Sequence, residues 1–153
     1  MEIEQIRDIL KNWGVYYPSE ENIQTTNKIG KSIIWIDDDE QVIANLVWYL
    51  YSATKGRLEI LIQEKTTSLV DVANKIEASS AEIVLMDYQL QGYTGVEIAK
   101  ELIRRGSKKQ ILGFSSISYG EEEFENLGIN SILKNCMREK IEKMLGQIEQ
   151  ASK

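Results

Sequence analysis

The sequence predicts an α/β fold, a mostly parallel sheet of five strands covered by helices on both faces. Short apolar runs at 32–36, 58–62, 83–86, 110–114 and 131–133 have the length of buried strands. Segments in which apolar residues recur at helical spacing follow these runs. The length of 153 residues suits one domain with a sizeable core. This alternation is typical of parallel sheets joined by right-handed crossovers.

The helices are marked by apolar spacing and by glycines that end them. Between the first two strands the spaced apolar residues are Val42, Ile43, Leu46, Val47 and Leu50. Further helices are expected around 69–76 and 96–103, and a loop that contains Gly92 and Gly95 precedes the second of them. The acidic segment 121–127 predicts a short helix closed by Gly128, and the last helix is expected over 137–148.

Residues 1–30 are expected to form an N-terminal helix and connector, and residues 31–153 the domain itself. The apolar residues at helical spacing near the N-terminus are Ile3, Ile6, Ile9, Leu10 and Trp13. Gly14 follows as a stop, and a polar stretch leads to the first strand. We expect this helix to pack on the surface of the domain, with docking to a partner as the alternative.

The composition excludes several classes of function. Because the chain has no histidine, it has no imidazole general base, no Ser-His-Asp triad and no His-ligated zinc. The net charge of −6 argues against direct nucleic-acid binding. No apolar run approaches the roughly 20 residues that span a bilayer, so we expect no membrane insertion. The single cysteine, Cys136, fits a reducing compartment, and we expect a cytoplasmic protein.

Polar side chains stand where four of the expected strands end. Asp37 and Asp38 follow the first strand, Asp87 the third, Ser115 the fourth and Lys134 the fifth. Because the carboxyl ends of parallel strands meet at one edge, where open α/β sheets bind ligands, we expect these side chains to lie close together. Gln63-Glu64, at the end of the second strand, has no chemistry that this pattern explains.

Three carboxylates at one edge need a cation or a proton. Two unit charges ~4 Å apart repel by about 4 kcal/mol at an effective dielectric constant of roughly 20. Donors that are all oxygen suit Mg²⁺. Lys134 and Ser115 supply the groups that would bind phosphoryl oxygens beside the metal. The pattern therefore predicts phosphoryl transfer to a carboxylate, with Asp87 as the nucleophile.

Part of the acidic run has a simpler explanation. Asp39 and Glu40 are assigned to the start of the following helix, where carboxylates accept hydrogen bonds from free N–H groups and interact favourably with the helix dipole. The same explanation is the alternative for Asp37 and Asp38. It accounts for one or two acids but not for four beside Asp87.

These residues give the sequence a resemblance to the receiver domains of two-component response regulators. The resemblance covers about residues 31–152. It depends on the segments 33–39, 83–87, 114–116 and 132–134 and on Gly95, each in the family's order at an expected strand end or loop. It implies a flavodoxin-like, doubly wound five-stranded sheet in the strand order 2-1-3-4-5 with five flanking helices.

The resemblance implies that Asp87 is a phosphoacceptor. It would receive the phosphoryl group from the phosphohistidine of a sensor histidine kinase or a phosphotransfer protein. Asp38 would ligate Mg²⁺ directly and Asp37 mainly through water, with Asp87 and the backbone carbonyl of Gln89 as further ligands. The chain would then catalyse its own phosphorylation and dephosphorylation and would not be a metabolic enzyme.

Ser115 and Lys134 are the residues that the resemblance assigns to the phosphoryl group. Their rearrangement would reshape the face formed by the helix at 121–127, the strand at 131–133 and the last helix. Because the chain ends about one helix after Lys134, we expect a stand-alone receiver whose output is contact with a downstream protein on this face. A homodimer is left open.

Departures from the receiver pattern keep a second hypothesis open, an interaction module of the pseudo-receiver type that is not phosphorylated. Gln91 and Asn135 stand where the family usually has proline, and Ser131 stands where it usually has an aromatic switch residue.

A third hypothesis is a Mg²⁺-dependent phosphatase of the haloacid-dehalogenase type, in which Asp37 and Asp39 would form a D-x-D pair. Two observations argue against it. Gln41 stands two residues after Asp39, where that family has Thr or Val. No aspartate follows Asp87, so the late acidic metal motif of that family is missing.

Overall fold

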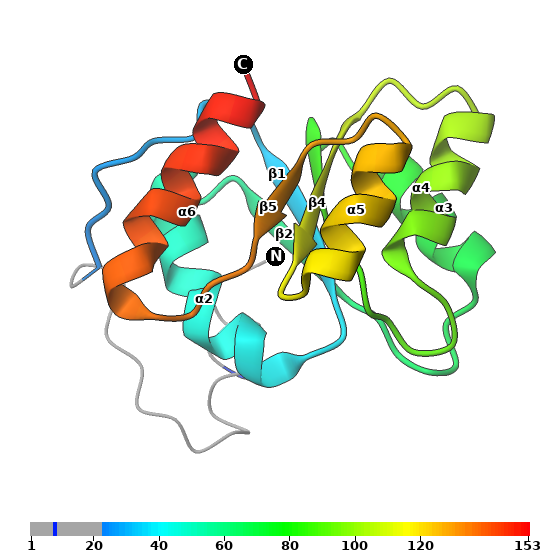
Figure 1. Ribbon diagram of the computed structural model, residues 1–153, viewed down its shortest axis with the longest axis horizontal. Coiled ribbons are helices and arrows are strands. Elements are labelled where there is room, and N and C mark those ends of the chain that lie inside the picture. Colours follow the sequence, from blue (N-terminus) through cyan, green and yellow to red (C-terminus); the bar gives the residue numbers. More distant parts are fainter. Residues whose placement is uncertain (1–7, 9–22) are drawn as a thin grey trace.

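The computed structural model describes residue 8 and residues 23–153, and its centre is a sheet of five parallel strands (Figure 1). The strands are β1 (Ile33–Asp37), β2 (Leu58–Ile62), β3 (Ile83–Asp87), β4 (Gln110–Ser115) and β5 (Ser131–Leu133). They lie in the order β2-β1-β3-β4-β5, and every neighbouring pair is parallel. The predicted fold class and strand order are confirmed.

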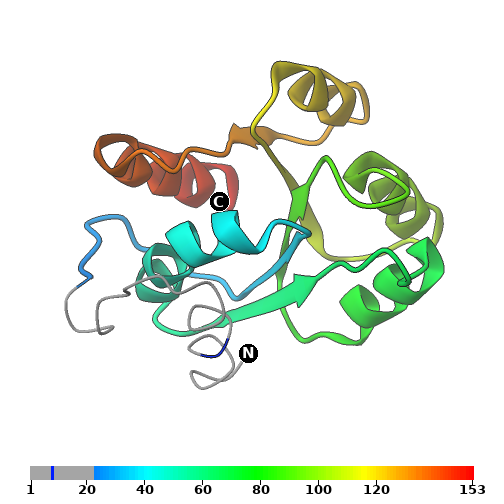
Figure 2. The same cartoon turned by 90° about the horizontal axis from the view of Figure 1, so that it is seen from below.

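Helices cover both faces of the sheet (Figures 1 and 2). They are α2 (Glu40–Ala53), α3 (Leu69–Ala78), α4 (Gly95–Arg104), α5 (Ser118–Asn126) and α6 (Arg138–Ala151). Helices α2 and α6 lie on one face, and α3, α4 and α5 lie on the other. Within the described residues no helix combines the length and the apolar character that crossing a membrane requires.

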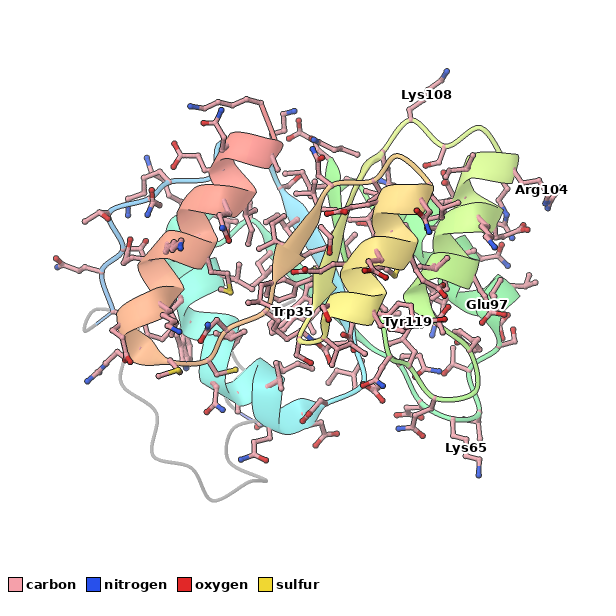
Figure 3. The ribbon with its side chains drawn as sticks, viewed as in Figure 1. Trp35, Lys65, Glu97, Arg104, Lys108 and Tyr119 are labelled. Carbon is pink, nitrogen blue, oxygen red and sulfur yellow. The ribbon has the colours of Figure 1, made fainter. Side chains whose placement is uncertain are left out.

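Burial on both faces explains why the central strands are almost wholly apolar. Every residue of β1 and β3 is buried, as expected for strands covered by helices on both sides. The side chains of β1 and β3 alternate between two clusters, one under α2 and α6 and one under α3, α4 and α5. Trp35 lies in the interior against Phe114, with ring centroids 5.9 Å apart, whereas Arg104 and Lys108 extend outward (Figure 3).

The short acidic helix begins earlier than the sequence pattern indicates. The expected range was 121–127, whereas α5 begins at Ser118. Glycine is unfavourable in helix interiors, so Gly120 weakens the helical pattern in the sequence of the first turn. The glycine is needed because a Cβ there would lie 2.5 Å from the Ser115 hydroxyl oxygen and 2.7 Å from the Tyr88 ring. The close approach of α5 to the ends of β3 and β4 therefore requires a residue without a side chain.

The end of the N-terminal connector packs against the domain. Ile29 is buried in the core, and its N–H donates to the carbonyl of Ala53 at 2.9 Å. The carboxylate of Glu142 on α6 accepts hydrogen bonds from Thr26 and Asn27, the shortest at 2.7 Å from the Thr26 hydroxyl. The helix expected before Gly14 lies outside the described residues, apart from residue 8, and the domain boundary at residue 30 stays a prediction.

We predict that Glu142→Gln lowers the free energy of unfolding by about 1 kcal/mol at pH 7, because the hydrogen bonds from Thr26 and Asn27 lose a charged acceptor. Burial acts to raise the pKa of Glu142, but these hydrogen bonds outweigh it and hold the pKa below its ordinary value. A lowered pKa means that the stabilisation is complete above the ordinary glutamate value, roughly 4.3, and is lost as the pH falls through the lower value of the folded state.

Urea unfolding of the wild type and the variant at a series of pH values measures this difference. Glu149→Gln on the same helix is the control, and it should change the free energy of unfolding by less than about 0.5 kcal/mol. A difference between wild type and Glu142→Gln that does not shrink as the pH falls would contradict the prediction.

Candidate functional site

The sheet brings three carboxylates together at the carboxyl ends of its two central strands. Asp37 is the last residue of β1, Asp38 follows it, and Asp87 is the last residue of β3. One carboxylate oxygen from each lies within 4.8 Å of the others. The register that pairs Ile36 with Met86 places the two strand ends side by side, so parallel pairing is the reason for the cluster.

Lys134 joins two of these carboxylates. Its Nζ lies 2.7 Å from Asp37 Oδ2 and 2.9 Å from Asp87 Oδ1, and all three residues are buried. The N–H of Lys134 donates to the carbonyl of Ser115 at 2.9 Å, which continues the β4–β5 pairing and holds the lysine at this edge of the sheet. Its ammonium group also lies 5.4 Å from the centre of the Phe114 ring.

Asp37 has both carboxylate oxygens engaged by the protein. Oδ2 accepts from Lys134 and from the indole N–H of Trp35 at 3.2 Å, and Oδ1 accepts from the backbone N–H of Asp39 at 3.0 Å. Asp37 is also fully buried. The structure therefore leaves Asp38 and Asp87 as the acids that face the solvent side of the cluster.

The cluster carries more negative charge than its lysine can balance. Desolvation by burial, together with repulsion from Asp37, outweighs the attraction of Lys134 and raises the pKa of Asp87 to about 7. Burial, followed by repulsion from Asp37, also raises the pKa of Asp38. Burial acts to lower the pKa of Lys134, but Asp37 and Asp87 outweigh it and raise the pKa, so the lysine is charged. A second cation would relieve the remaining repulsion.

A cleft of about 550 Å³ opens over this cluster. The residues that line it are Asp38, Asp39, Glu40, Val42, Asp87, Gln89, Ser116 and Lys134. Apart from Val42 they are all polar or charged. Such a lining suits a small hydrated cation and does not suit an apolar ligand.

The hydroxyl of Ser115 does not point into the cleft but bonds to its own loop. Ser115 Oγ donates to the carbonyl of Ile117 at 2.9 Å and accepts from the N–H of Ile117 at 3.1 Å. The next residue, Ser116, is exposed and lines the cleft instead. The position of Ser115 at a strand end is evident from the sequence. The direction of its hydroxyl is not, and neither is the presence of Ser116 in the lining of the cleft.

Asp39 occupies the role that its position before α2 predicts. Its carboxylate accepts from the N–H groups of Gln41 and Val42 at 3.0 and 3.3 Å, which caps the helix. A carboxylate committed to a helix N-terminus does not favour the D-x-D arrangement of the phosphatase hypothesis.

The donor set fits Mg²⁺. Asp38, Asp87 and the loop residue Gln89 line the cleft beside the cluster, and each of them has oxygens that could bind a cation. Mg²⁺ keeps several waters and uses one or two carboxylates, which agrees with two accessible acids and an open cleft. The carboxylate of Asp37 is enclosed by the protein, and Asp37 is not among the residues that line the cleft.

The β3–α4 loop, residues 88–94, is held tightly beside the cluster. The N–H of Gly95 donates to the carbonyl of Tyr88 at 2.8 Å, and a Cβ on Gly95 would overlap the Asp87 carbonyl oxygen. Gln89 and Thr94 form a β-bridge across the loop. Gln63, which the sequence analysis leaves without a role, bonds to the backbone of Gln91 through its side chain. The receiver pattern in the sequence includes Gly95, whereas no motif in the sequence identifies Gln63.

Comparisons with known proteins give matches in structure alone. No protein-family profile matches the chain, and no curated protein matches it.

Receiver domains and response regulators are among the solved structures that match. A LuxR-family DNA-binding response regulator from Staphylococcus aureus matches with a TM-score of 0.63 and 19% identity over 80% of this chain and 99% of that one. The BeF3-activated receiver domain of DrrB, a protein of Thermotoga maritima, matches with a TM-score of 0.60 and 15% identity, covering 81% and 98% of the two chains. TrrA from Thermotoga maritima, in complex with Mg²⁺-BeF, matches with a TM-score of 0.55 and 18% identity. The match covers 74% of this chain and 98% of that one. The chain has the fold of these receiver domains.

We predict that Lys134→Met lowers the free energy of unfolding by about 3 kcal/mol without divalent cations, because it leaves two buried carboxylates without their cation. Urea unfolding followed by circular dichroism measures the loss. The exposed Lys143→Met on α6 is the control, with an expected change below about 0.5 kcal/mol. Equal stability of Lys134→Met and wild type would show that the two ion pairs contribute nothing to the fold.

Proposed function

We propose that the chain is a phosphoacceptor receiver that takes a phosphoryl group onto Asp87 from the phosphohistidine of a sensor histidine kinase or a phosphotransfer protein. The observation that carries the proposal is the cluster of the buried Asp37 and Asp87 with the partly exposed Asp38, in which Lys134 is bound to the two buried acids. The receiver fold supports it, because this cluster lies at the carboxyl ends of the strands, where the fold binds ligands.

Asp87 is the acid best placed to act as the nucleophile. It lies at the end of a central strand, lines the cleft and bonds to Lys134 through Oδ1. In the transfer, a carboxylate oxygen of Asp87 forms a bond to phosphorus while the bond from phosphorus to the donor imidazole nitrogen breaks. The nitrogen keeps the electron pair and takes up a proton. The absence of histidine from this chain agrees with a donor on another protein.

Asp38, Asp87 and the backbone carbonyl of Gln89 would hold Mg²⁺, with Asp37 in contact through water. The metal would neutralise the oxygens of the phosphoryl group as charge builds up on them. The complex of TrrA with Mg²⁺-BeF, on the same fold, supports this choice of cation. Lys134 would pair with a phosphoryl oxygen from the opposite side, as its position between the two acids favours.

Ser115 would connect the phosphoryl group to the output face. To donate to a phosphoryl oxygen, its hydroxyl must give up the bond to the carbonyl of Ile117, the residue that precedes α5. Loss of that bond would free the start of α5, where Tyr119 is 59% exposed and packs against Tyr88. A downstream protein would read the change on the face formed by α5, β5 and α6. A cytoplasmic location stays a prediction.

We predict that the wild type incubated with acetyl phosphate and Mg²⁺ gains one phosphoryl group, and that Asp87→Asn gains none. Intact-mass spectrometry detects the group, and sensitivity to hydroxylamine identifies it as an acyl phosphate. Asp39→Asn is the control, because asparagine also caps a helix and this position has no part in the proposed transfer.

A wild type that takes up no phosphoryl group and binds no beryllofluoride in the presence of Mg²⁺ would contradict the proposal. That result would instead support the pseudo-receiver hypothesis. Hydrolysis of simple phosphate esters would support the phosphatase hypothesis.

A further inference from the structure

Gln63 bonds to the end of β1 and to the β3–α4 loop, the two segments that flank the candidate cation site, although it lies outside the cleft. It follows β2 directly and is 1% exposed. Its backbone N–H donates to the carbonyl of Asp37 at 2.8 Å. Its side-chain Nε2 donates to the carbonyl of Gln91 at 2.8 Å, and its Oε1 accepts from the N–H of Gln91 at 2.8 Å. One residue therefore connects the end of β1 to the β3–α4 loop.

The side-chain contact constrains the loop strongly. A primary amide that bonds to both the N–H and the C=O of one residue fixes that residue in position and in orientation. Because Gln63 is buried, neither of its polar atoms can exchange its partner for bulk water without exposing the amide. Gln91 itself is exposed, and Gly92 beside it has a φ of +89°, whereas Leu90 before it packs against the core under α3, α4 and α5.

The constrained loop is the one that carries Gln89. Gln89 lines the cleft beside Asp87 and lies two residues before Gln91. The loop has other contacts as well: the β-bridge between Gln89 and Thr94 closes it on itself, and the N–H of Gly95 bonds to the carbonyl of Tyr88. Tyr93 donates from its hydroxyl to the carbonyl of Thr67 at 2.7 Å, beyond the glycine. Gln63 adds to these the contact that ties the backbone of Gln91 to the end of β2.

We propose that Gln63 is a positioning residue for the cation site, which holds the β3–α4 loop so that the Gln89 carbonyl is in place before Mg²⁺ binds. The inference rests on the proposed function for the identity of the cation. A ligand held in place beforehand costs less conformational entropy when the metal binds, so loss of the clamp should appear as weaker Mg²⁺ affinity.

The test compares Mg²⁺ binding by wild type and Gln63→Met, a variant that keeps the length of the side chain and removes both polar atoms. Calorimetric titration should give a dissociation constant for Mg²⁺ that is roughly tenfold larger in Gln63→Met. At saturating Mg²⁺, labelling of Asp87 by acetyl phosphate should return to the wild-type level, because Asp87 and Lys134 are unchanged. A general loss of structure would instead reduce labelling at every Mg²⁺ concentration.

Gln110→Met is the matched control. Gln110 Nε2 also donates to a backbone carbonyl, that of Ala151 at 2.6 Å, but Gln110 begins β4 at the opposite edge of the sheet from the cleft. We expect the Mg²⁺ affinity of Gln110→Met to equal that of the wild type. Thermal unfolding of both variants shows whether they lose similar stability. If Gln63→Met does not fold, Gln63→Ala is used in its place.

The outcomes separate the two proposals. A dissociation constant of Gln63→Met within about twofold of the wild type, or an equal loss of affinity in Gln110→Met, overturns the role of Gln63. Mg²⁺ binding without labelling of the wild type overturns the phosphoacceptor proposal alone, since the effect of Gln63 on the dissociation constant is still measured. A wild type that binds no Mg²⁺ overturns both.

Discussion

The pairing of one buried lysine with carboxylates from two adjacent strands is the constraint that organises this molecule. Lys134 directly follows the edge strand β5, yet its ammonium group reaches Asp37 and Asp87 on the two central strands. The lysine side chain passes the end of β4 to reach Asp87, and the ends of β4 and β3 to reach Asp37, so both contacts depend on the register of these strands. Burial makes the loss of either partner costly, and the surplus acid leaves the cluster short of positive charge. Fold and site are therefore coupled through the same three side chains.

Much of the fold could be predicted because its signals are local. The apolar runs of β1 and β3 stand out in the sequence, and parallel pairing then places Asp37 and Asp87 side by side without further information. The start of α5 could not be predicted, because Gly120 weakens the helical pattern for the sake of close packing against Ser115. In that case a tertiary requirement overrode helix propensity.

The parts of the site that sequence reasoning could not supply depend on the direction of side chains. Asp87 and Lys134 follow from strand ends, but the turn of the Ser115 hydroxyl toward Ile117 depends on loop geometry. Gln63 is unremarkable in the sequence, and its partner Gln91 stands where the receiver pattern usually has proline. Proline has no N–H, so a residue with an N–H at 91 gives Gln63 a hydrogen bond that the usual residue could not offer.

The indole of Trp35 gives the buried cluster a neighbour with optical properties. Its N–H donates to the same Asp37 oxygen that accepts from Lys134, so the ring lies within hydrogen-bonding range of the least accessible acid. The absorption and emission of an indole depend on the electric field around it. A redistribution of charge among the acids and the lysine therefore changes the field at the ring of Trp35, which solvent cannot reach. The absorption and emission of Trp35 report on the charge of the cluster.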